Sequence, residues 1–275
     1  MKRNPLVSRK ALAFFDTLRI SANLLRKSPM TCILEKSQRK PGVTMSDSFP
    51  MKVIATMRSP FPAKFGIPRQ SGLVDSLRST IVFEPEYRNP DALRGLESFS
   101  HLWVIWSFSK AIREDWSPTV RPPRLGGNTR MGVFATRSPF RPNAIGLSSV
   151  KIERIEQDPR LGPVIHVTGA DLLDRTPIFD IKPYLPYTDS HPDALGGFTD
   201  GYRGYRLEVD FPQALLEKVP VSARESLIGV LAQDPRPSYQ DDPDRVYGMA
   251  FGTVDVKFQV SDGVLTVIGV EPVGC

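Results

Sequence analysis

The sequence is poor in residues that bind metals or form disulfides, and it lacks a membrane-spanning run. Its two cysteines, Cys32 and Cys275, lie near opposite ends of the chain, so they form neither a CxxC metal motif nor a disulfide framework. The three histidines, His101, His166 and His191, are far apart, and no HExxH motif is present. We therefore predict no metal cofactor. No apolar run approaches the roughly 20 residues of a transmembrane helix, which argues against a membrane protein.

Common nucleotide-binding and hydrolase motifs are also missing. No GxGxxG follows an expected strand, and neither GxxxxGK(S/T) nor GxSxG occurs. These absences argue against a Rossmann dinucleotide site, a P-loop and a nucleophile elbow. Proline accounts for 26 of the 275 residues, about twice its usual share, which favours turns and short strands over long helices. Hydrophobic residues make up 40% of the chain, which is enough for a substantial core.

The net charge of +6 is unevenly distributed along the chain. Residues 1–44 carry ten Lys or Arg against two acids, a net of +8, so residues 45–275 carry a net of −2. A strand-like pattern begins soon after Met45. We therefore expect residues 1–44 to be a disordered leader or to precede the native start at Met45. A targeting segment and a nucleic-acid-binding arm are the alternatives.

From residue 51 onward, short runs rich in Val, Ile, Phe and Tyr alternate with Pro and Gly clusters. The expected strands are 52–58, 80–84, 102–108, 132–136, 147–155, 164–170 and 205–211. They predict a mostly antiparallel barrel or sandwich. Asn89 before Pro90 is typical of a capped helix start, so we expect a short helix through about Glu97.

Helical spacing at 214–219 and 222–233, followed by strand-like runs at 246–251, 254–260 and 265–270, indicates a second, smaller α+β domain. The predicted domains are 45–211 and 212–275.

Positive charge is concentrated in residues 116–152, a stretch without an acidic residue. Its six cations are Arg121, Arg124, Arg130, Arg137, Arg141 and Lys151. The stretch is also rich in proline and glycine, which fix loops and let the backbone approach a ligand. Arginine side chains held on such loops suit phosphate or carboxylate groups. The alternative is an exposed basic loop whose arginines pair with acids of a neighbouring segment.

Several acidic residues are candidates for a site. Asp171 and Asp174 follow an expected strand and could bind ribose hydroxyls, a cation or a sulfonium, although a simple turn at the strand exit explains them equally well. Asp180 is flanked by apolar residues, and partial burial would raise its pKa and make it a candidate base. Its alternative role is an ion pair with Lys182 or an arginine.

The segment DPRPSY, residues 234–239, follows the expected helix and carries three polar side chains fixed by two prolines. Tyr239 could stack on a base and Arg236 could contact phosphate, whereas a plain helix stop is the alternative. Trp103, Trp106 and Phe108 fit a core better than a ligand platform.

Four segments together resemble a known family. GLESFSHLWVIW, RPPRLGGNTRMGVFATRSPFRPNAIG, DLLDRTPIFDIKPYLPY and LAQDPRPSY resemble, in this order, the TrmO family of tRNA methyltransferases, also called the YaeB or VirR-like family. The resemblance covers residues 53–272. It implies an S-adenosylmethionine-dependent enzyme that methylates N6 of N6-threonylcarbamoyladenosine at position 37 of threonine tRNA. It also implies an antiparallel β-barrel instead of a Rossmann sheet, a small α+β C-terminal domain, a homodimer with the cofactor near the subunit interface, and a cytoplasmic protein.

The resemblance also assigns cofactor contacts to individual residues. They are Pro68, Arg69 and Gln70 in IPRQSG, then Ser109, Lys110, Arg137 and Leu147, and finally Asp171, Leu172, Leu173 and Asp174. At Ser109 and Lys110 this chain departs from the His-Gln usual in the family, so only backbone contacts are expected there. A lysine is unfavourable beside a sulfonium, so we expect Lys110 to turn away or to meet a carboxylate.

For the chemistry, we expect Asp180 or Asp234 to accept the N6 proton, with Asp180 slightly favoured by its apolar neighbours. The residues expected to contact tRNA phosphates or the threonyl carboxylate are Arg121, Arg124, Arg130, Arg141, Arg236 and Tyr239. Two alternatives remain. One is a non-catalytic RNA-binding or regulatory protein, and the other is a methyltransferase with a small-molecule or protein acceptor.

Overall fold

The computed structural model describes residues 49–274 apart from 114, 238–239 and 241. Residues 50–275 form one compact unit, distinct from residues 1–49. The expectations for residues 1–44 lie outside the described residues. No helix in the described part of the chain is long and apolar enough to cross a membrane.

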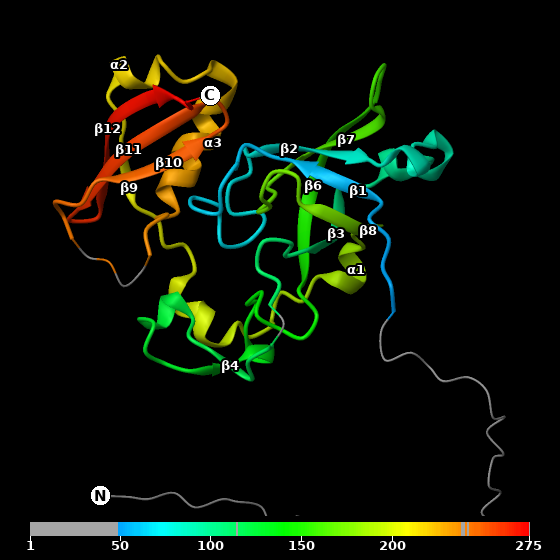
Figure 1. Cartoon of the computed structure of the whole chain (residues 1–275), viewed down its shortest axis with the longest axis horizontal. Helices are drawn as coiled ribbons and strands as arrows, with labels where there is room; N and C mark the ends of the chain where they lie inside the picture. The colour runs from blue at the N-terminus through cyan, green and yellow to red at the C-terminus, as the bar shows by residue number, and fades with distance from the viewer. Residues whose placement is uncertain (1–48, 114, 238–239, 241, 275) are drawn as a thin grey trace, which may run out of the picture. The chain divides into compact units, whose positions relative to one another are not determined.

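The first part of the chain forms a sheet of six strands that closes on itself (Figure 1). The strands are β1 (Ala55–Arg58), β2 (Arg78–Phe83), β3 (His101–Ser107), β6 (Ile145–Asp158), β7 (Gly162–Thr168) and β8 (Pro177–Pro183). Their order is β1-β2-β7-β6-β3-β8, every pair is antiparallel, and β8 pairs with β1 to complete the ring. The mostly β prediction is confirmed.

Alternation along the strands explains the interior of the ring. In β3, the side chains of Leu102, Val104 and Trp106 are buried, whereas the residues between them are only partly covered. Because successive side chains of a strand point to opposite faces, the buried set faces the core. It joins Met57 and Ile165 in one apolar cluster inside the ring.

Between and after these strands lie 3₁₀ turns and a small two-stranded sheet. The turns are η1 (Pro85–Tyr87), η2 (Pro90–Leu93), η3 (Leu96–Ser98), η4 (Pro123–Leu125), η5 (Val133–Ala135) and η6 (Gly197–Tyr202). The small sheet pairs β4 (Thr119–Val120) with β5 (Met131–Gly132). A short helix, α1 (Pro186–Asp189), follows β8.

Three local predictions need correction. The cap at Asn89 is confirmed, since its Oδ1 accepts a hydrogen bond from the backbone of Asp91 at 3.0 Å, but two 3₁₀ turns replace the expected helix. The expected strand 132–136 is mostly the turn η5, because Thr136 donates its backbone N–H back to Val133. The strand β8, which closes the ring, was not among the expected strands, although the alternative role of Asp180 was that of a strand residue paired with Lys182 or an arginine.

A second sheet follows in the order β10-β11-β12-β9. Its strands are β9 (Glu208–Asp210), β10 (Tyr247–Phe251), β11 (Val254–Ser261) and β12 (Val264–Pro272), accompanied by helices α2 (Gln213–Leu216) and α3 (Val221–Ala232). The helices agree closely with prediction. Leu227 and Leu231 of α3 pack with the sheet in a second apolar cluster, which Phe61, Val74 and Leu77 also join. The predicted boundary at residue 211 stays a prediction, although β9, which precedes it, pairs with β12.

Candidate cofactor and RNA site

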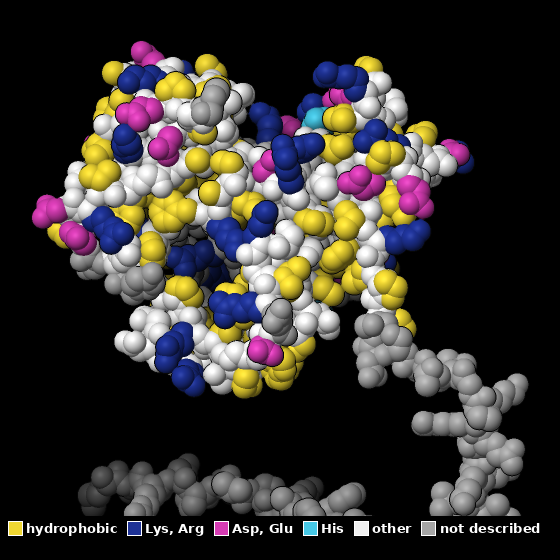
Figure 2. Space-filling view, in the orientation of Figure 1, with side chains coloured by type: hydrophobic (Ala, Val, Ile, Leu, Met, Phe, Trp, Pro, Cys, Tyr) yellow, Lys and Arg dark blue, Asp and Glu magenta, His cyan; other side chains and the backbone are white. Residues whose placement is uncertain are grey.

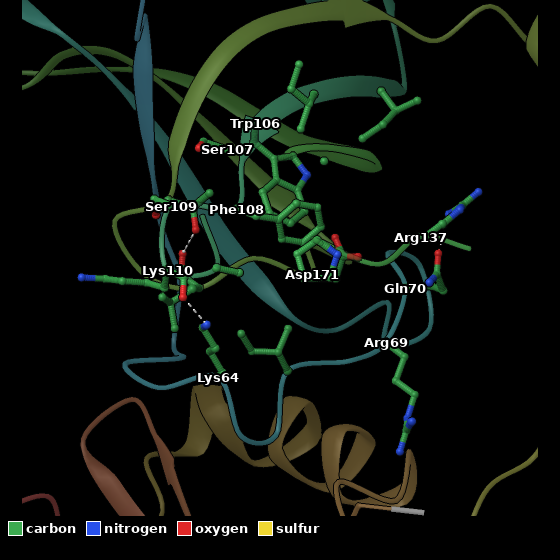
Figure 3. A pocket seen from close by; sticks show the side chains of 18 of the residues that line it. Lys64, Arg69, Gln70, Trp106, Ser107, Phe108, Ser109, Lys110, Arg137 and Asp171 are labelled. Atoms are coloured by element: carbon green, nitrogen blue, oxygen red, sulfur yellow. Dashed lines mark hydrogen bonds between the residues drawn. The ribbon is translucent and has the colours of Figure 1, made fainter. Parts of the chain in front are cut away.

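A cavity of about 470 Å³ opens at one end of the closed sheet (Figure 3). Four chain segments line it, namely residues 64–70 before β2, 106–111 at the end of β3, 136–147 leading into β6, and 171–176 before β8. Its volume is within the range of pockets that bind small organic ligands. The cavity therefore lies where turns and strand ends converge, and not within the apolar interior of the ring.

Aromatic side chains form one wall of this cavity. Trp106 and Phe108 both line it, with ring centroids 4.2 Å apart. Directly across the strand pair from Trp106 is Gly146, where a Cβ atom would come within 2.2 Å of the Trp106 ring. Only glycine therefore lets the indole lie flat against β6. The sequence-based placement of Trp106 in the core is confirmed, since it is 8% exposed, but the same side chain also faces the cavity.

A single acidic side chain, Asp171, lines the cavity among the described residues. Its Oδ1 accepts a 2.5 Å hydrogen bond from Ser148 Oγ, which in turn accepts a 3.0 Å hydrogen bond from Trp106 Nε1. Burial raises the pKa of Asp171 above its ordinary value, and the hydrogen bond from Ser148 partly opposes this shift. The chain thus holds one carboxylate with an enhanced affinity for a proton beside the aromatic wall.

The other charged side chains that line the cavity are cations, and oxygen atoms of the chain accept hydrogen bonds from several of them. Arg137 donates to Gln70 Oε1, and Arg69 donates to the carbonyl oxygen of Arg236 at 3.1 Å. Arg141 donates to the carbonyl oxygen of Thr136 at 2.8 Å. The bonds of Arg137 and Arg141 go to neutral oxygens and do not cancel the charge of these two guanidinium groups, so their part of the rim suits an anionic ligand.

The side chain of Lys110 turns away, which is one of the two outcomes expected for it. Figure 3 shows its side chain extending away from Asp171 and the aromatic wall. Its backbone carbonyl remains at the cavity, where it accepts a 2.5 Å hydrogen bond from Lys64 Nζ. The backbone of Lys110 thus lies at the cavity while its charged group points away from it.

Nine of the eleven residues expected to contact a cofactor come together at this cavity. They are Pro68, Arg69, Gln70, Ser109, Lys110, Arg137, Leu147, Asp171 and Leu173. Leu172 instead lies fully buried in the core of the ring. Asp174 turns toward the end of β1, where its Oδ1 accepts a 3.1 Å hydrogen bond from the backbone of Ser59.

Asp180, the favoured base in the sequence, does not line the cavity. It pairs with Ile105 across β3 and β8, on the face of the sheet opposite the buried Val104 and Trp106. Its Oδ2 lies 2.9 Å from Lys182 Nζ. The structure thus shows the ion pair that the sequence left open as the alternative.

Asp234, the second candidate base, is also engaged. Its two carboxylate oxygens accept hydrogen bonds from Arg236 Nε and Nη2 at 2.9 and 3.1 Å, and Tyr205 donates to Oδ2 at 3.2 Å. The Arg236 side chain is only 12% exposed, so its guanidinium contacts Asp234 and not the surface. Tyr239 lies outside the described residues.

The remaining predicted RNA contacts fall on what we call the arginine lobe, residues 116–141, which contains β4 and β5. Arg121 and Arg130 are exposed there. Arg141 belongs to the cavity as well, since its side chain lines it. The side chain of Arg124 is outside the described part of the structure.

Two contributors to the site were missed in the sequence, namely Ser148 and Gly146. Ser148 bridges Trp106 and Asp171, and Gly146 admits the indole ring. Gly146 is the last residue of the motif RPPRLGGNTRMGVFATRSPFRPNAIG, and Ser148 lies two residues after it, at the start of an expected strand. Their importance depends on the pairing of β3 with β6, which a single sequence does not reveal.

Comparison with known proteins identifies the family. Residues 56–190 match the tRNA-methyltransferase O N-terminal domain, and residues 205–273 match the TrmO C-terminal domain. The chain is 40% identical over 235 residues to a tRNA (adenine(37)-N6)-methyltransferase of Escherichia coli, which covers 82% of this chain and 99% of that protein. It is 48% identical over 177 residues to a protein of the same name from Eikenella corrodens, which covers 64% of this chain and 99% of that protein.

A solved structure agrees with these matches. The crystal structure of TrmO from Pseudomonas aeruginosa superposes with a TM-score of 0.67 at 33% identity, covering 84% of this chain and all of that one. The cavity thus lies in a fold that this chain shares with these proteins along nearly their whole length. The chain belongs to the tRNA-methyltransferase O family.

Proposed function

We propose that this protein transfers a methyl group from S-adenosylmethionine to N6 of N6-threonylcarbamoyladenosine at position 37 of threonine tRNA. The observation that carries the proposal is the cavity, because it gathers residues from four distant segments that the family resemblance assigns to the cofactor. The curated relatives are named tRNA (adenine(37)-N6)-methyltransferases, which supports adenosine 37 as the acceptor. We further infer that the closed sheet is the cofactor-binding β-barrel of the family.

The residues of the cavity fit the proposed cofactor. Trp106 and Phe108 offer aromatic surface to an adenine ring, and exposed Leu147 offers apolar surface. The carboxylate of Asp171 suits either a ribose hydroxyl or a positive sulfonium. When bound, S-adenosylmethionine supplies an electrophilic methyl group and needs no metal. The protein must then align the acceptor with this group and exclude water.

The acceptor nitrogen needs a base, because its lone pair is delocalised into a carbamoyl group while it keeps its proton. The geometry favours Asp171 over the two bases suggested by the sequence, since Asp180 and Asp234 are each paired with a cation. Asp171 lines the cavity, and its raised pKa matches a base that holds a proton more firmly than an ordinary aspartate.

The arginines of the cavity and the arginine lobe are assigned to the anionic groups of the substrate. Arg137 and Arg141 line the cavity and suit the threonyl carboxylate, whereas Arg121 and Arg130 are placed for backbone phosphates. Exposed Ile145 and Leu147 at the cavity mouth are apolar surface of the kind that a second copy would cover, which supports a homodimer. We propose that the enzyme acts as this homodimer in the cytoplasm.

The direct test is transfer of labelled methyl from S-adenosylmethionine to two threonine tRNAs that differ only in the threonylcarbamoyl group, followed by nucleoside analysis. We expect label only on the carbamoylated tRNA, at N6 of adenosine 37. Label on neither tRNA, with the cofactor still bound, would point to a small-molecule or protein acceptor. Failure to bind the cofactor at all would favour a non-catalytic RNA-binding protein.

A further inference from the structure

Two aromatic side chains stand exposed on the arginine lobe, outside the cavity. Trp116 is 50% exposed and Phe134 is 70% exposed, and their rings are stacked with centroids 6.0 Å apart and planes 29° apart. Large apolar side chains exposed singly are common on protein surfaces, whereas a stacked and exposed pair is a shaped surface. We call Trp116 and Phe134 the aromatic pair.

The backbone of the arginine lobe holds the aromatic pair in place. Trp116 lies just before β4 and Phe134 just after β5, and these strands pair through Thr119 and Gly132. The backbone N–H of Val133 donates to the carbonyl oxygen of Pro118 at 2.9 Å, which ties together the two chain segments that carry the rings. The rings therefore need little reordering to accept a flat ligand, which lowers the entropic cost of binding.

Arginines lie near the aromatic pair, and one of them connects it to the cavity, although the exposed acid Asp115 directly precedes Trp116. The Arg141 guanidinium carbon lies 5.8 Å from the Phe134 ring centroid, and the same side chain lines the cavity. Arg121 and Arg130 are exposed on the same lobe. Over the region labelled β4 in Figure 1, Figure 2 shows mainly Lys and Arg side chains next to hydrophobic ones, with an acidic side chain among them.

This combination indicates the chemical class of the partner. Exposed aromatic rings bind unpaired nucleobases by stacking, and the surrounding arginines bind the phosphates that link those bases. A second copy of this chain is a poorer match for this surface, because residues 116–141 contain no acid and two arginine lobes facing each other would repel. The dimer contact proposed at Ile145 and Leu147 lies outside the lobe.

We propose that the aromatic pair stacks on an unpaired base of the anticodon loop beside the nucleotide that enters the cavity. Arg141 connects the two sites, since its guanidinium lies over the Phe134 ring and its side chain lines the cavity. The inference rests on the proposed function in that it assigns this surface to the same RNA substrate. It adds a binding site for a neighbouring base, distinct from the site of methyl transfer.

The test uses the full-length protein and fluorescently labelled threonine tRNA. Replacing either ring by leucine, as Trp116→Leu or Phe134→Leu, keeps apolar volume but removes the aromatic face. We expect each change to weaken tRNA affinity by about 10-fold, since stacking of one base contributes ~1–3 kcal/mol. The conservative change Trp116→Phe should retain most of the affinity. Tyr187→Leu removes another exposed aromatic ring, on α1, and serves as the matched control.

Salt dependence separates stacking from charge. The slope of log affinity against log salt counts the phosphates that the protein neutralises. Trp116→Leu should therefore lower affinity at every salt concentration without changing the slope, whereas Arg130→Gln should reduce the slope by about one. Tryptophan fluorescence adds a second readout, because RNA should quench emission in the wild type more than in Trp116→Phe.

Each outcome decides the matter. Unchanged RNA affinity in both leucine variants, in an enzyme that methylates tRNA, would overturn the aromatic site and leave the proposed function standing. Loss of dimerisation in the leucine variants at unchanged RNA affinity would overturn it in favour of a protein interface. RNA quenching of Trp116 in a protein that methylates no tRNA would support the aromatic site and refute the proposed function.

Discussion

The arginine lobe and the outer face of the closed sheet both carry arginines, but in the described part of the structure those of the outer face are paired with acids and those of the lobe are not. On the outer face, Arg78 lies 2.8 Å from Glu153, and Arg154 lies 3.1 Å from Glu156. On the arginine lobe there is no acid in the sequence, and Arg137 and Arg141 bond to neutral oxygens. The comparison teaches that net charge is a poor guide to binding surfaces. A body with a net charge of −2 still presents a cationic rim where its acids are absent.

The largest expected effect comes from neutralising the acid of the cavity, with an acid of the outer face as the comparison. Asp171→Asn keeps the hydrogen bond from Ser148 but removes the proton acceptor, so we expect methyl transfer in single turnover to fall by about 10²–10⁴-fold. Asp180→Asn, on the outer face, should change it less than about twofold, because that carboxylate is paired with Lys182. Equal losses in both variants, or none in Asp171→Asn, would contradict the assignment.

The second test concerns the cations themselves. The double variant Arg121→Gln with Arg130→Gln should weaken tRNA binding by at least about 10-fold at physiological salt and reduce the salt slope by about two. The charge-matched control is Arg78→Gln with Arg154→Gln on the outer face. If the control lost as much affinity as the lobe variant, RNA would contact the paired face too, and the contrast would fail.

A third and smaller effect concerns the pH dependence of the free energy of unfolding. The folded protein binds a proton at Asp171 at a pH where the unfolded chain has already released it, because burial raises the pKa in the folded state. Wild-type stability should therefore rise as pH falls through that raised pKa, and Asp171→Asn should lack this rise. Chemical denaturation of both proteins between about pH 3 and pH 8, a range that begins below the ordinary aspartate pKa of about 3.9, measures it. Parallel curves would show that the pKa of Asp171 is ordinary.

The smallest effect should come from the outer face. Arg78→Gln removes an ion pair whose arginine side chain is 62% exposed, so the free energy of unfolding should change by less than about 1 kcal/mol. Thermal unfolding at low and high salt provides the measurement. A larger loss of unfolding free energy would mean that the ion pairs of the outer face stabilise the fold. Their acids would then do more than neutralise nearby cations.

Much of the fold was accessible from the sequence where patterns are local. The alternation in 102–108 and the helical spacing in 222–233 predicted β3 and α3 closely, because each pattern reflects burial of one face. The strand β8 escaped notice because Pro177 and Pro183 mark its ends and Asp180 interrupts its apolar run. Proline is tolerated at these positions because a strand terminus need not donate to the ladder.

The site was accessible only in part, for a different reason. The resemblance placed nine residues at the cavity, yet their meeting depends on strand pairings between distant segments. The ion pair of Asp180 with Lys182 follows from spacing alone, since residues two apart share a face of a strand. The hydrogen-bonded chain from Trp106 through Ser148 to Asp171 crosses three segments, so no local pattern reveals it.

The position of β8 in the chain has a consequence for how the enzyme is made. The ring cannot close until residue 183 has left the ribosome, so until then β1 and β3 each present an unpaired edge. Pairing β1 with β8 joins residues more than 120 positions apart, a long loop closure that slows folding. Residues 171–176 directly precede β8, so the binding cavity matures at the same moment. A nascent chain therefore gains its ligand site only when the ring closes and the edges of β1 and β3 become paired.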